Sequence, residues 1–154
     1  MIIISWNIRG VRSPSKRIAI RDLISNNRGQ LIFLQETKLE QMTDSVVREL
    51  VPFHRPEWCG KNAMGTAGGI LCIWDPRFVS VQNHLIGDYY IIFEVTDLSS
   101  NKVWFTGVIY GPSTYRQRAV FWEDLSNAVG QHQGPWLLGG DFNATLSRNE
   151  KHPP

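Results

Sequence analysis

The order of strand, helix and strand at the beginning of the chain is the feature that most limits how it can fold. Residues 2–6 and 31–34 are short apolar runs, and the first is rich in β-branched residues; both patterns are typical of buried strands. Two strands joined by a helical crossover pair in parallel, with a right-handed connection. The sequence therefore predicts a parallel βαβ unit. Asn7 and Glu36 follow its strands at the carboxyl ends, where such units form their binding sites.

The remaining sequence predicts one domain with further helices and strands. A chain of 154 residues, 42% hydrophobic and 19% charged, is long enough to bury a core and too apolar for a disordered protein. Ser15 stands where the N-cap of the first helix is expected, and turn residues between positions 69 and 110 favour an antiparallel meander. The expected helices cover residues 16–26, 43–50 and 116–129, and the further strands cover residues 69–74, 78–85, 89–95, 103–110 and 135–138. The last helix is expected to bury Val120, Phe121, Leu125 and Val129.

Several classes of protein are excluded at this stage. Cys59 and Cys72 are too few for a disulfide framework and do not have zinc-ligand spacing, so we expect them to be reduced and structural. The N-terminus lacks the basic segment and the long apolar run of a signal peptide, and no window approaches the roughly 18 apolar residues of a membrane span. By elimination we expect a soluble protein of the nucleus or cytoplasm that is neither secreted nor membrane-bound. The formal net charge of +2 does not decide its partner.

Three of the apolar strands end in short polar sequences. Asn7 follows the first strand, Glu36 follows the second, and Asp141 and Asn143 follow the last. A carboxylate or amide at the mouth of a strand is partly shielded from water yet open to a ligand, as a hard cation and a phosphate require. Each of these residues alone could equally shape a turn or face solvent. Their joint occurrence favours a site.

The polar sequences also carry a family resemblance. The chain resembles the endonuclease/exonuclease/phosphatase superfamily, which includes DNase I-like nucleases, abasic endonucleases of the exonuclease III type and inositol polyphosphate phosphatases. Within this superfamily the sequence is most similar to the endonuclease domain of plant LINE-type non-LTR retrotransposons. The similar features are Arg9-Gly10, a basic first helix and residues 66–69, which contain two glycines and precede an apolar strand. The stretches that carry the resemblance are Ser5–Gly10, Leu34–Lys38, Val108–Pro112 and Leu138–Asn143.

The resemblance implies both a fold and a site. The fold is an α/β, four-layer sandwich of two mixed sheets flanked by helices. The implied cofactor is Mg²⁺, with Mn²⁺ as an alternative, and its ligands would be Glu36 and Asn7. Tyr110 would donate its hydroxyl to a phosphate oxygen. Asp141 would position or deprotonate the attacking water, and Asn143 would help to hold that water and the phosphate.

The chain also departs from the family pattern. Family members carry a further segment that ends in a Ser-Asp-His signature, and that tripeptide does not occur in this sequence. We therefore expect residues 1–154 to be a single incomplete domain, truncated at the C-terminus, with an unpaired sheet edge and weak or no activity of its own. The histidines are expected to be surface or loop residues rather than catalysts, namely His54, His84, His132 and His152.

The leading hypothesis is a metal-dependent DNA endonuclease. It would nick one strand and leave a 3′-hydroxyl that primes reverse transcription by a reverse transcriptase encoded downstream. Residues 1–30 hold six basic residues against one acidic residue, and Arg9 and Arg12 are the best candidates for DNA contact. Two alternatives stay open: a phosphatase acting on inositol phosphates or lipids, and a non-catalytic DNA-binding or decayed fragment.

Overall fold

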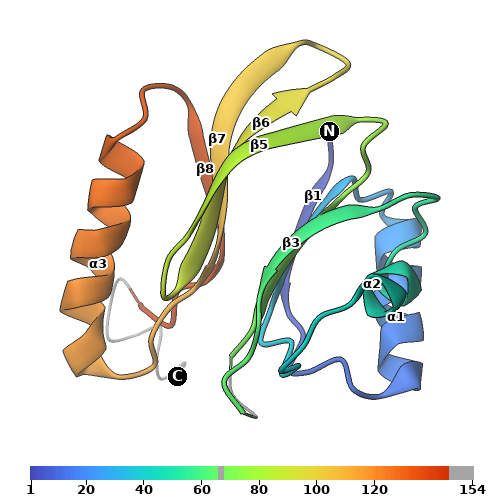
Figure 1. The fold of residues 1–154 in the computed structure, drawn as a ribbon, viewed down its shortest axis with the longest axis horizontal. Helices are drawn as coiled ribbons and strands as arrows, with labels where there is room; N and C mark the ends of the chain where they lie inside the picture. The colour runs from blue at the N-terminus through green and yellow to red at the C-terminus, as the bar shows by residue number, and fades with distance from the viewer. Residues whose placement is uncertain (66–67, 146–154) are drawn as a thin grey trace, which may run out of the picture.

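Two four-stranded sheets pack face to face between layers of helices in the computed structural model, which describes residues 1–65 and 68–145. From one side to the other, the layers are α3, the second sheet, the first sheet, and α1 with α2 (Figure 1). This arrangement confirms the predicted four-layer α/β sandwich. The elements are β1 (Ile3–Asn7), α1 (Pro14–Asn26), β2 (Leu31–Gln35), α2 (Asp44–Leu50), β3 (Glu57–Lys61), β4 (Ile70–Trp74), β5 (Val79–Ile86), β6 (Tyr90–Asp97), β7 (Lys102–Tyr110), α3 (Tyr115–Gly130) and β8 (Trp136–Asp141).

The first sheet contains the predicted βαβ unit. β1 and β2 pair in parallel, with Asn7 opposite Gln35 at their carboxyl ends. All five residues of β2 are buried because both faces of this strand are covered. The helix between the strands begins earlier than predicted. Ser13, not Ser15, is its N-cap, because Pro14 has the fixed φ that suits the first helical turn.

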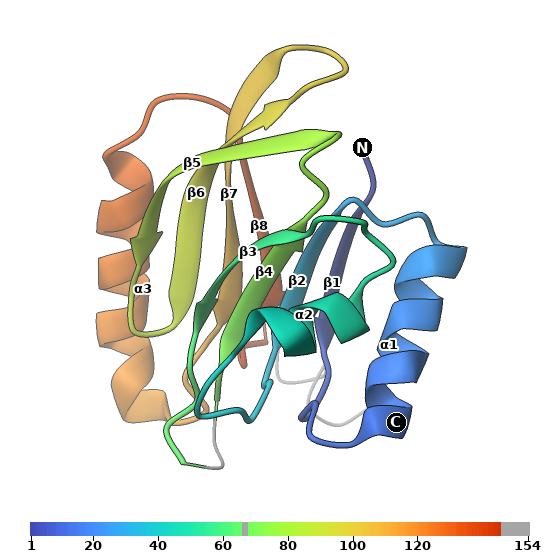
Figure 2. The ribbon, with the colours of Figure 1, turned by 45° about the vertical axis from the view of Figure 1, so that its right-hand side comes forward.

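The prediction of one antiparallel meander over residues 69–110 is wrong for its first strand. β4 leaves the meander and lies in the first sheet, antiparallel to β2 on one side and to β3 on the other (Figure 2). Sequence analysis missed β3, because Gly60 and the polar residues at both its ends hide the alternation of a strand. β5, β6 and β7 do form an antiparallel meander. α3 then returns the chain so that β8 pairs in parallel with β7.

Three groups of apolar side chains hold the layers together. The core between the sheets is centred on Phe33 and Phe93, whose ring centroids lie 6.2 Å apart. A second core joins the first sheet to α1 and α2, and a third joins the second sheet to α3. The buried side of α3 differs from the prediction, because Val120 is 68% exposed and Ala128 is buried instead.

Two further expectations concern the cysteines and membrane-spanning helices. Cys59 and Cys72 face each other across β3 and β4 as free cysteines, as expected. Burial raises the pKa of both thiols, most strongly that of Cys72. In the part of the chain that the structure describes, no helix has both the length and the apolar character needed to cross a membrane.

Candidate active site

Four strand ends bring the predicted site residues to one edge of the sandwich. β1 and β2 run in parallel in the first sheet, and β7 and β8 run in parallel in the second. Tyr110 and Asp141 are register partners at the ends of β7 and β8. Because the two sheets pack face to face, the four carboxyl ends meet across the space between them.

Two hydrogen bonds join the strand ends of one sheet to those of the other. The Asn7 side chain donates from Nδ2 to Asp141 Oδ2 at 2.8 Å. The Tyr110 hydroxyl donates to Glu36 Oε1 at 3.2 Å. Each bond joins one residue of the first sheet to one residue of the second, so the four side chains form one cluster. The structure therefore brings together the residues that the sequence pointed to individually.

Asn143 belongs to the same cluster. Its backbone N–H donates to Asp141 Oδ1 at 3.0 Å, and its side chain donates from Nδ2 to the Gly111 carbonyl at 2.7 Å. Asp141 thus accepts a hydrogen bond at each carboxylate oxygen, one from Asn143 and one from Asn7. These bonds fix the direction of the Asp141 carboxylate, as a group that must orient a reactant requires.

The backbone is strained at this edge. Seven residues other than glycine have positive φ in the described chain, and four of them lie at or beside the cluster: Arg9 (51°), Glu36 (59°), Lys38 (56°) and Asn143 (49°). A side chain in this region costs about 1 to 3 kcal/mol, and such residues concentrate at functional sites. The strain is an observation independent of residue type that marks the same place in the fold.

Two glycines allow the ends of β7 and β8 to approach this closely. Gly140 has φ 147°, and a Cβ at this position would collide with the Ile109 carbonyl oxygen. A Cβ at Gly111 would collide with the Phe142 carbonyl. Without a side chain at either position, the two strand ends stay paired and Tyr110 remains opposite Asp141.

The charges around Tyr110 act on its hydroxyl. Loss of water around the ring, the negative charge of Glu36 and the hydrogen bond to it, and then the charge of Asp141 raise the pKa of Tyr110 to about 12. The phenol is therefore a hydrogen-bond donor at neutral pH. The negative charges of Glu36 and Asp141 thus both favour the protonated Tyr110 hydroxyl.

The oxygen atoms of the cluster suit a hard cation. Residues 1–65 and 68–145 contain no group of three or more His, Cys, Asp or Glu side chains that could hold a metal ion. Mg²⁺ does not need such a group, because it keeps several waters and binds through one or two carboxylates together with substrate phosphate. Tyr110 and Lys38 both approach Oε1 of Glu36, at 3.2 and 3.8 Å, and Oε2 receives no hydrogen bond from the described residues. Glu36 Oε2 is therefore open to a cation, whereas the Asn7 side-chain oxygen also accepts a hydrogen bond from the Arg9 backbone N–H at 3.2 Å. The assignment of Glu36 and Asn7 as metal ligands stays a prediction.

Basic side chains surround a shallow hollow beside Glu36. It has a volume of about 240 Å³, and its basic lining residues, which we call the basic flank, are Arg9, Arg12, Lys16 and Lys38. Arg12 donates from Nε to the Lys38 carbonyl at 3.2 Å, and Lys16 donates from Nζ to the Arg9 carbonyl at 3.1 Å. Sequence analysis singled out Arg9 and Arg12. It missed Lys38 as part of this group, although Lys38 follows Glu36 by two positions.

The histidines lie elsewhere. His54 and His84 are exposed, and His132 packs against Phe105 before the start of β8, with the ring centroids 4.9 Å apart and the ring planes tilted by 30°. Asp141 is at the other end of that strand. His152 lies outside the described residues. Among the described histidines, none joins the cluster.

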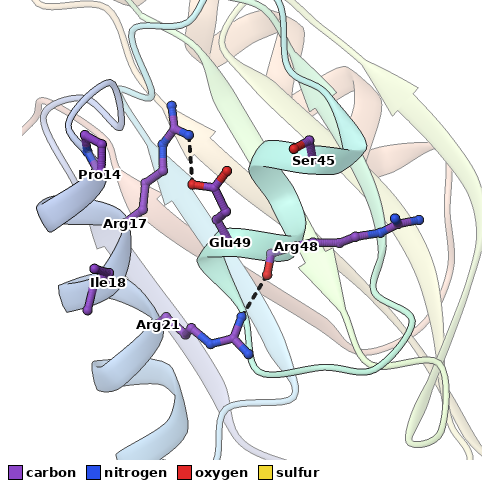
Figure 3. A pocket seen from close by; sticks show the side chains of 7 residues that line it. All are labelled: Pro14, Arg17, Ile18, Arg21, Ser45, Arg48 and Glu49. Atoms are coloured by element: carbon purple, nitrogen blue, oxygen red, sulfur yellow. Dashed lines mark hydrogen bonds and ion pairs between the residues drawn. The ribbon is translucent and has the colours of Figure 1, made fainter.

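Two larger cavities also lie in the described part of the molecule. One, of about 470 Å³, adjoins the cluster and shares Tyr110 and Asn143 with it. The other, of about 550 Å³, lies between α1 and α2 and contains none of the predicted site residues. Two of its three arginines have structural partners: Arg17 pairs with Glu49 at 2.9 Å, and Arg21 donates to the Arg48 carbonyl at 2.8 Å (Figure 3). The α1–α2 cavity thus follows from the way in which these helices are tied together.

Comparison with known proteins supports the same fold. A family model described as the endonuclease/exonuclease/phosphatase family matches residues 4–154. No curated protein matches the chain in sequence.

Similar solved structures share the fold at low sequence identity. They include a mannosyl-6-phosphatase of Bacteroides thetaiotaomicron (12% identity, TM-score 0.72) and the human Nocturnin catalytic domain with bound sulfate (15%, 0.64). A third is TDP2 of D. rerio complexed with single strand DNA product (17%, 0.68). These matches cover 95%, 96% and 97% of this chain, but 67%, 66% and 63% of the respective solved chains.

Proposed function

Because the chain belongs to the endonuclease/exonuclease/phosphatase family, we propose that it is a Mg²⁺-dependent phosphodiesterase that nicks DNA and leaves a 3′-hydroxyl. The observation that carries this proposal is the pair of hydrogen bonds between the sheets, which gathers two carboxylates, an amide and a phenol at one edge of the sandwich. A phosphodiester with an attacking water needs donors and acceptors of these kinds.

DNA is the substrate that the surroundings of the cluster favour. The basic flank beside Glu36 offers four cations to a phosphate backbone. A similar structure, TDP2 of D. rerio, was solved with a single strand DNA product. The resemblance to plant LINE endonuclease domains extends the proposal to a biological role, in which the 3′-hydroxyl primes reverse transcription.

Each residue of the cluster has a proposed part in hydrolysis. Asp141, held in direction by Asn7 and Asn143, orients the attacking water and accepts its proton. Tyr110 transfers its hydrogen bond from Glu36 to a phosphate oxygen when substrate binds. As the water oxygen bonds to phosphorus, the bond from phosphorus to the 3′-oxygen breaks, and the leaving oxygen is protonated from solvent. Glu36 and Asn7 would hold Mg²⁺ or Mn²⁺, which as a Lewis acid stabilises the negative charge that develops on the phosphate.

We expect slow turnover from this chain. None of the described histidines lies at the cluster, so none of them can orient the phosphate or protonate the leaving group there. Loss of one catalytic partner commonly lowers rates by orders of magnitude. The assay must therefore detect single nicks.

Nicking of supercoiled plasmid tests the proposal. Purified protein is incubated with plasmid in Mg²⁺ or EDTA, and we expect relaxed circles only in Mg²⁺. Glu36→Gln and Asp141→Asn should each lower the rate about a hundredfold or more. Glu40→Gln and Asp22→Asn make the same chemical changes at exposed positions and should not alter it.

The reaction products and metal binding provide further readouts. A DNA polymerase should extend the nicks directly, because each carries a 3′-hydroxyl. Mg²⁺ should raise the thermal midpoint of the wild-type protein more than that of Glu36→Gln, because a bound ion stabilises the folded state. DNA binding without nicking would point to the non-catalytic alternative. Hydrolysis of inositol phosphates with no action on DNA would point to the phosphatase alternative.

A further inference from the structure

The 470 Å³ cavity beside the cluster, which we call the side pocket, has features that the hydrolysis of a phosphate does not use. We propose that the side pocket binds one unpaired nucleobase of the substrate, next to the phosphate at Glu36. The inference rests on the proposed function, because it is the position of that phosphate that brings the base to the pocket. It adds a substrate class: DNA that is single-stranded or unpaired at the nick.

The walls of the side pocket are suited to a flat apolar group. Its lining includes Tyr89, Tyr110, Met64 and Pro112, together with the charged residues Lys61 and Asp88. The faces of aromatic rings stack on any base, and a thioether adapts its shape to a ring. A volume of about 470 Å³ lies within the usual range of small-molecule sites.

Tyr110 connects the side pocket to the cluster. Its ring lines the pocket, while its hydroxyl donates to Glu36 at 3.2 Å. A base stacked on the Tyr110 ring and a phosphate at Glu36 would therefore be separated by about the length of one tyrosine side chain. Because base and phosphate belong to the same or neighbouring nucleotides, a single DNA strand can occupy both positions at once.

A glycine in the wall opposite Tyr110 leaves room beside the ring. Gly68 has φ 76°, and a Cβ at this position would lie 3.9 Å from Tyr110 Cε1, whereas a Cβ at Gly69 (φ 92°) would collide with the Thr37 hydroxyl. The carbonyls of the two glycines accept hydrogen bonds from the backbone of Lys38 at 3.0 Å and of Thr37 at 3.2 Å. This wall is thus fastened to the residues next to Glu36. Among the described residues, no side chain of this wall fills the space beside the ring at Gly68.

Polar side chains at the rim match the edge of a base. Ser113, Gln117 and Asn143 line the same pocket. Ser113 and Gln117 are exposed, and Gln117 Oε1 already accepts from the Thr114 hydroxyl at 2.6 Å, which leaves its amide N–H groups to donate. An apolar cavity with a few polar groups at its edge is the usual form of a site for a planar polar ring.

The shape favours one base over a base pair. A base inside a duplex is stacked on both faces, so it must leave the stack before its own face can contact Tyr110. Extrusion costs a few kcal/mol, and it costs least where the base is already unpaired. The side pocket thus favours single strands, loops or junctions over intact duplex.

Binding of a fluorescent base tests the inference without cleavage. A short single-stranded oligonucleotide carrying one 2-aminopurine is titrated with the full chain in EDTA at low salt. We expect quenching of 2-aminopurine as it stacks. Replacing that nucleotide by an abasic analogue should weaken binding about fivefold or more, since base–aromatic stacking contributes at least that factor.

Variants assign the signal to the side pocket. Met64→Ala changes a residue that is 87% exposed, so it leaves the fold intact, and it should reduce both the quenching and the preference for the base. Ile18→Ala removes an exposed apolar side chain from α1 and should have no effect. Tyr89→Leu should abolish the preference, and Tyr89→Phe, which keeps the ring, should retain it.

The outcomes separate this inference from the proposed function. Base preference in EDTA without nicking in Mg²⁺ would support the side pocket and refute the phosphodiesterase proposal. Nicking with equal affinity for base and abasic oligonucleotides would overturn the side pocket alone. Tight binding without quenching, or no binding to the oligonucleotide, would also overturn it.

Discussion

Replacing Tyr90 by Phe should change how the stability of the protein depends on alkaline pH. The Tyr90 side chain is 2% exposed beneath α3, and its hydroxyl donates to Asp124 Oδ2 at 2.9 Å. Burial, the hydrogen bond to Asp124 and the negative charge of this residue, with that of Asp88, raise the pKa of Tyr90 to about 12. The reference value for an unfolded tyrosine is 10.0.

The sign and size of the effect follow from proton linkage. The folded protein holds the Tyr90 proton more tightly than the unfolded chain does, so this contribution to stability is complete below pH 10. It is lost as the pH rises towards 12. One pKa unit corresponds to about 1.4 kcal/mol, so about that much is lost by pH 11 and about 2.7 kcal/mol at the limit. Tyr90→Phe has no proton to lose at this position.

Urea unfolding at pH 8, 9, 10 and 11, followed by circular dichroism, measures the effect. At pH 8 we expect the wild type to be more stable than Tyr90→Phe by about 1 to 3 kcal/mol, the contribution of a hydrogen bond to a charged group. That difference should shrink by about 1.4 kcal/mol between pH 9 and 11, while the titration of other groups cancels in the comparison. Tyr115→Phe removes a hydroxyl from a side chain that is 85% exposed, and serves as the control. A constant difference between wild type and Tyr90→Phe from pH 8 to 11 would refute the reasoning.

Three further predictions concern packing and capping. Gly140→Ala should lower the free energy of unfolding by several kcal/mol in urea titrations, because the new Cβ would collide with the Ile109 carbonyl. The control Gly130→Ala has open space around the new Cβ and should change the free energy of unfolding by less than about 1 kcal/mol. Equal effects of the two substitutions would contradict this prediction. Cys59 should react with a thiol reagent in the native protein faster than Cys72, which is 0% exposed and should react only on unfolding; equal rates in native buffer would argue against this packing. Thr43→Ala removes the side-chain acceptor of the Val46 N–H at the start of α2 and should cost about 1 kcal/mol in the same titration, with Thr43→Ser restoring most of it.

The site residues could be found from the sequence because each one follows a recognisable strand. Asn7, Glu36 and Asp141 come directly after or at the end of apolar runs, and parallel strands place their carboxyl ends at a common edge. The sequence did not predict which of these side chains contact one another. That Asn7 contacts Asp141, and that Tyr110 contacts Glu36, depends on how two sheets pack.

The errors in the predicted fold have a similar cause. The apolar run of β4 indicates a buried strand but not the sheet in which it lies, and only its antiparallel pairing with β2 decides this. On α3 the helical period allows Val120 or Ala128 on the buried side, and the approach of the second sheet selects Ala128. The side pocket was not predicted, because Met64 and Tyr89 lie in separate loops with no shared spacing.

The two bonds between the sheets also set the order in which the cluster can form. They join residues that are 134 and 74 positions apart, so Asn7 and Glu36 leave the ribosome long before Asp141 does. β1 to β4 can pair as the first sheet during synthesis, whereas β8 is made after all of them. A nascent chain therefore carries the first half of the cluster without the second. The proposed hydrolysis needs both halves of the cluster, so it can begin only after β8 has docked.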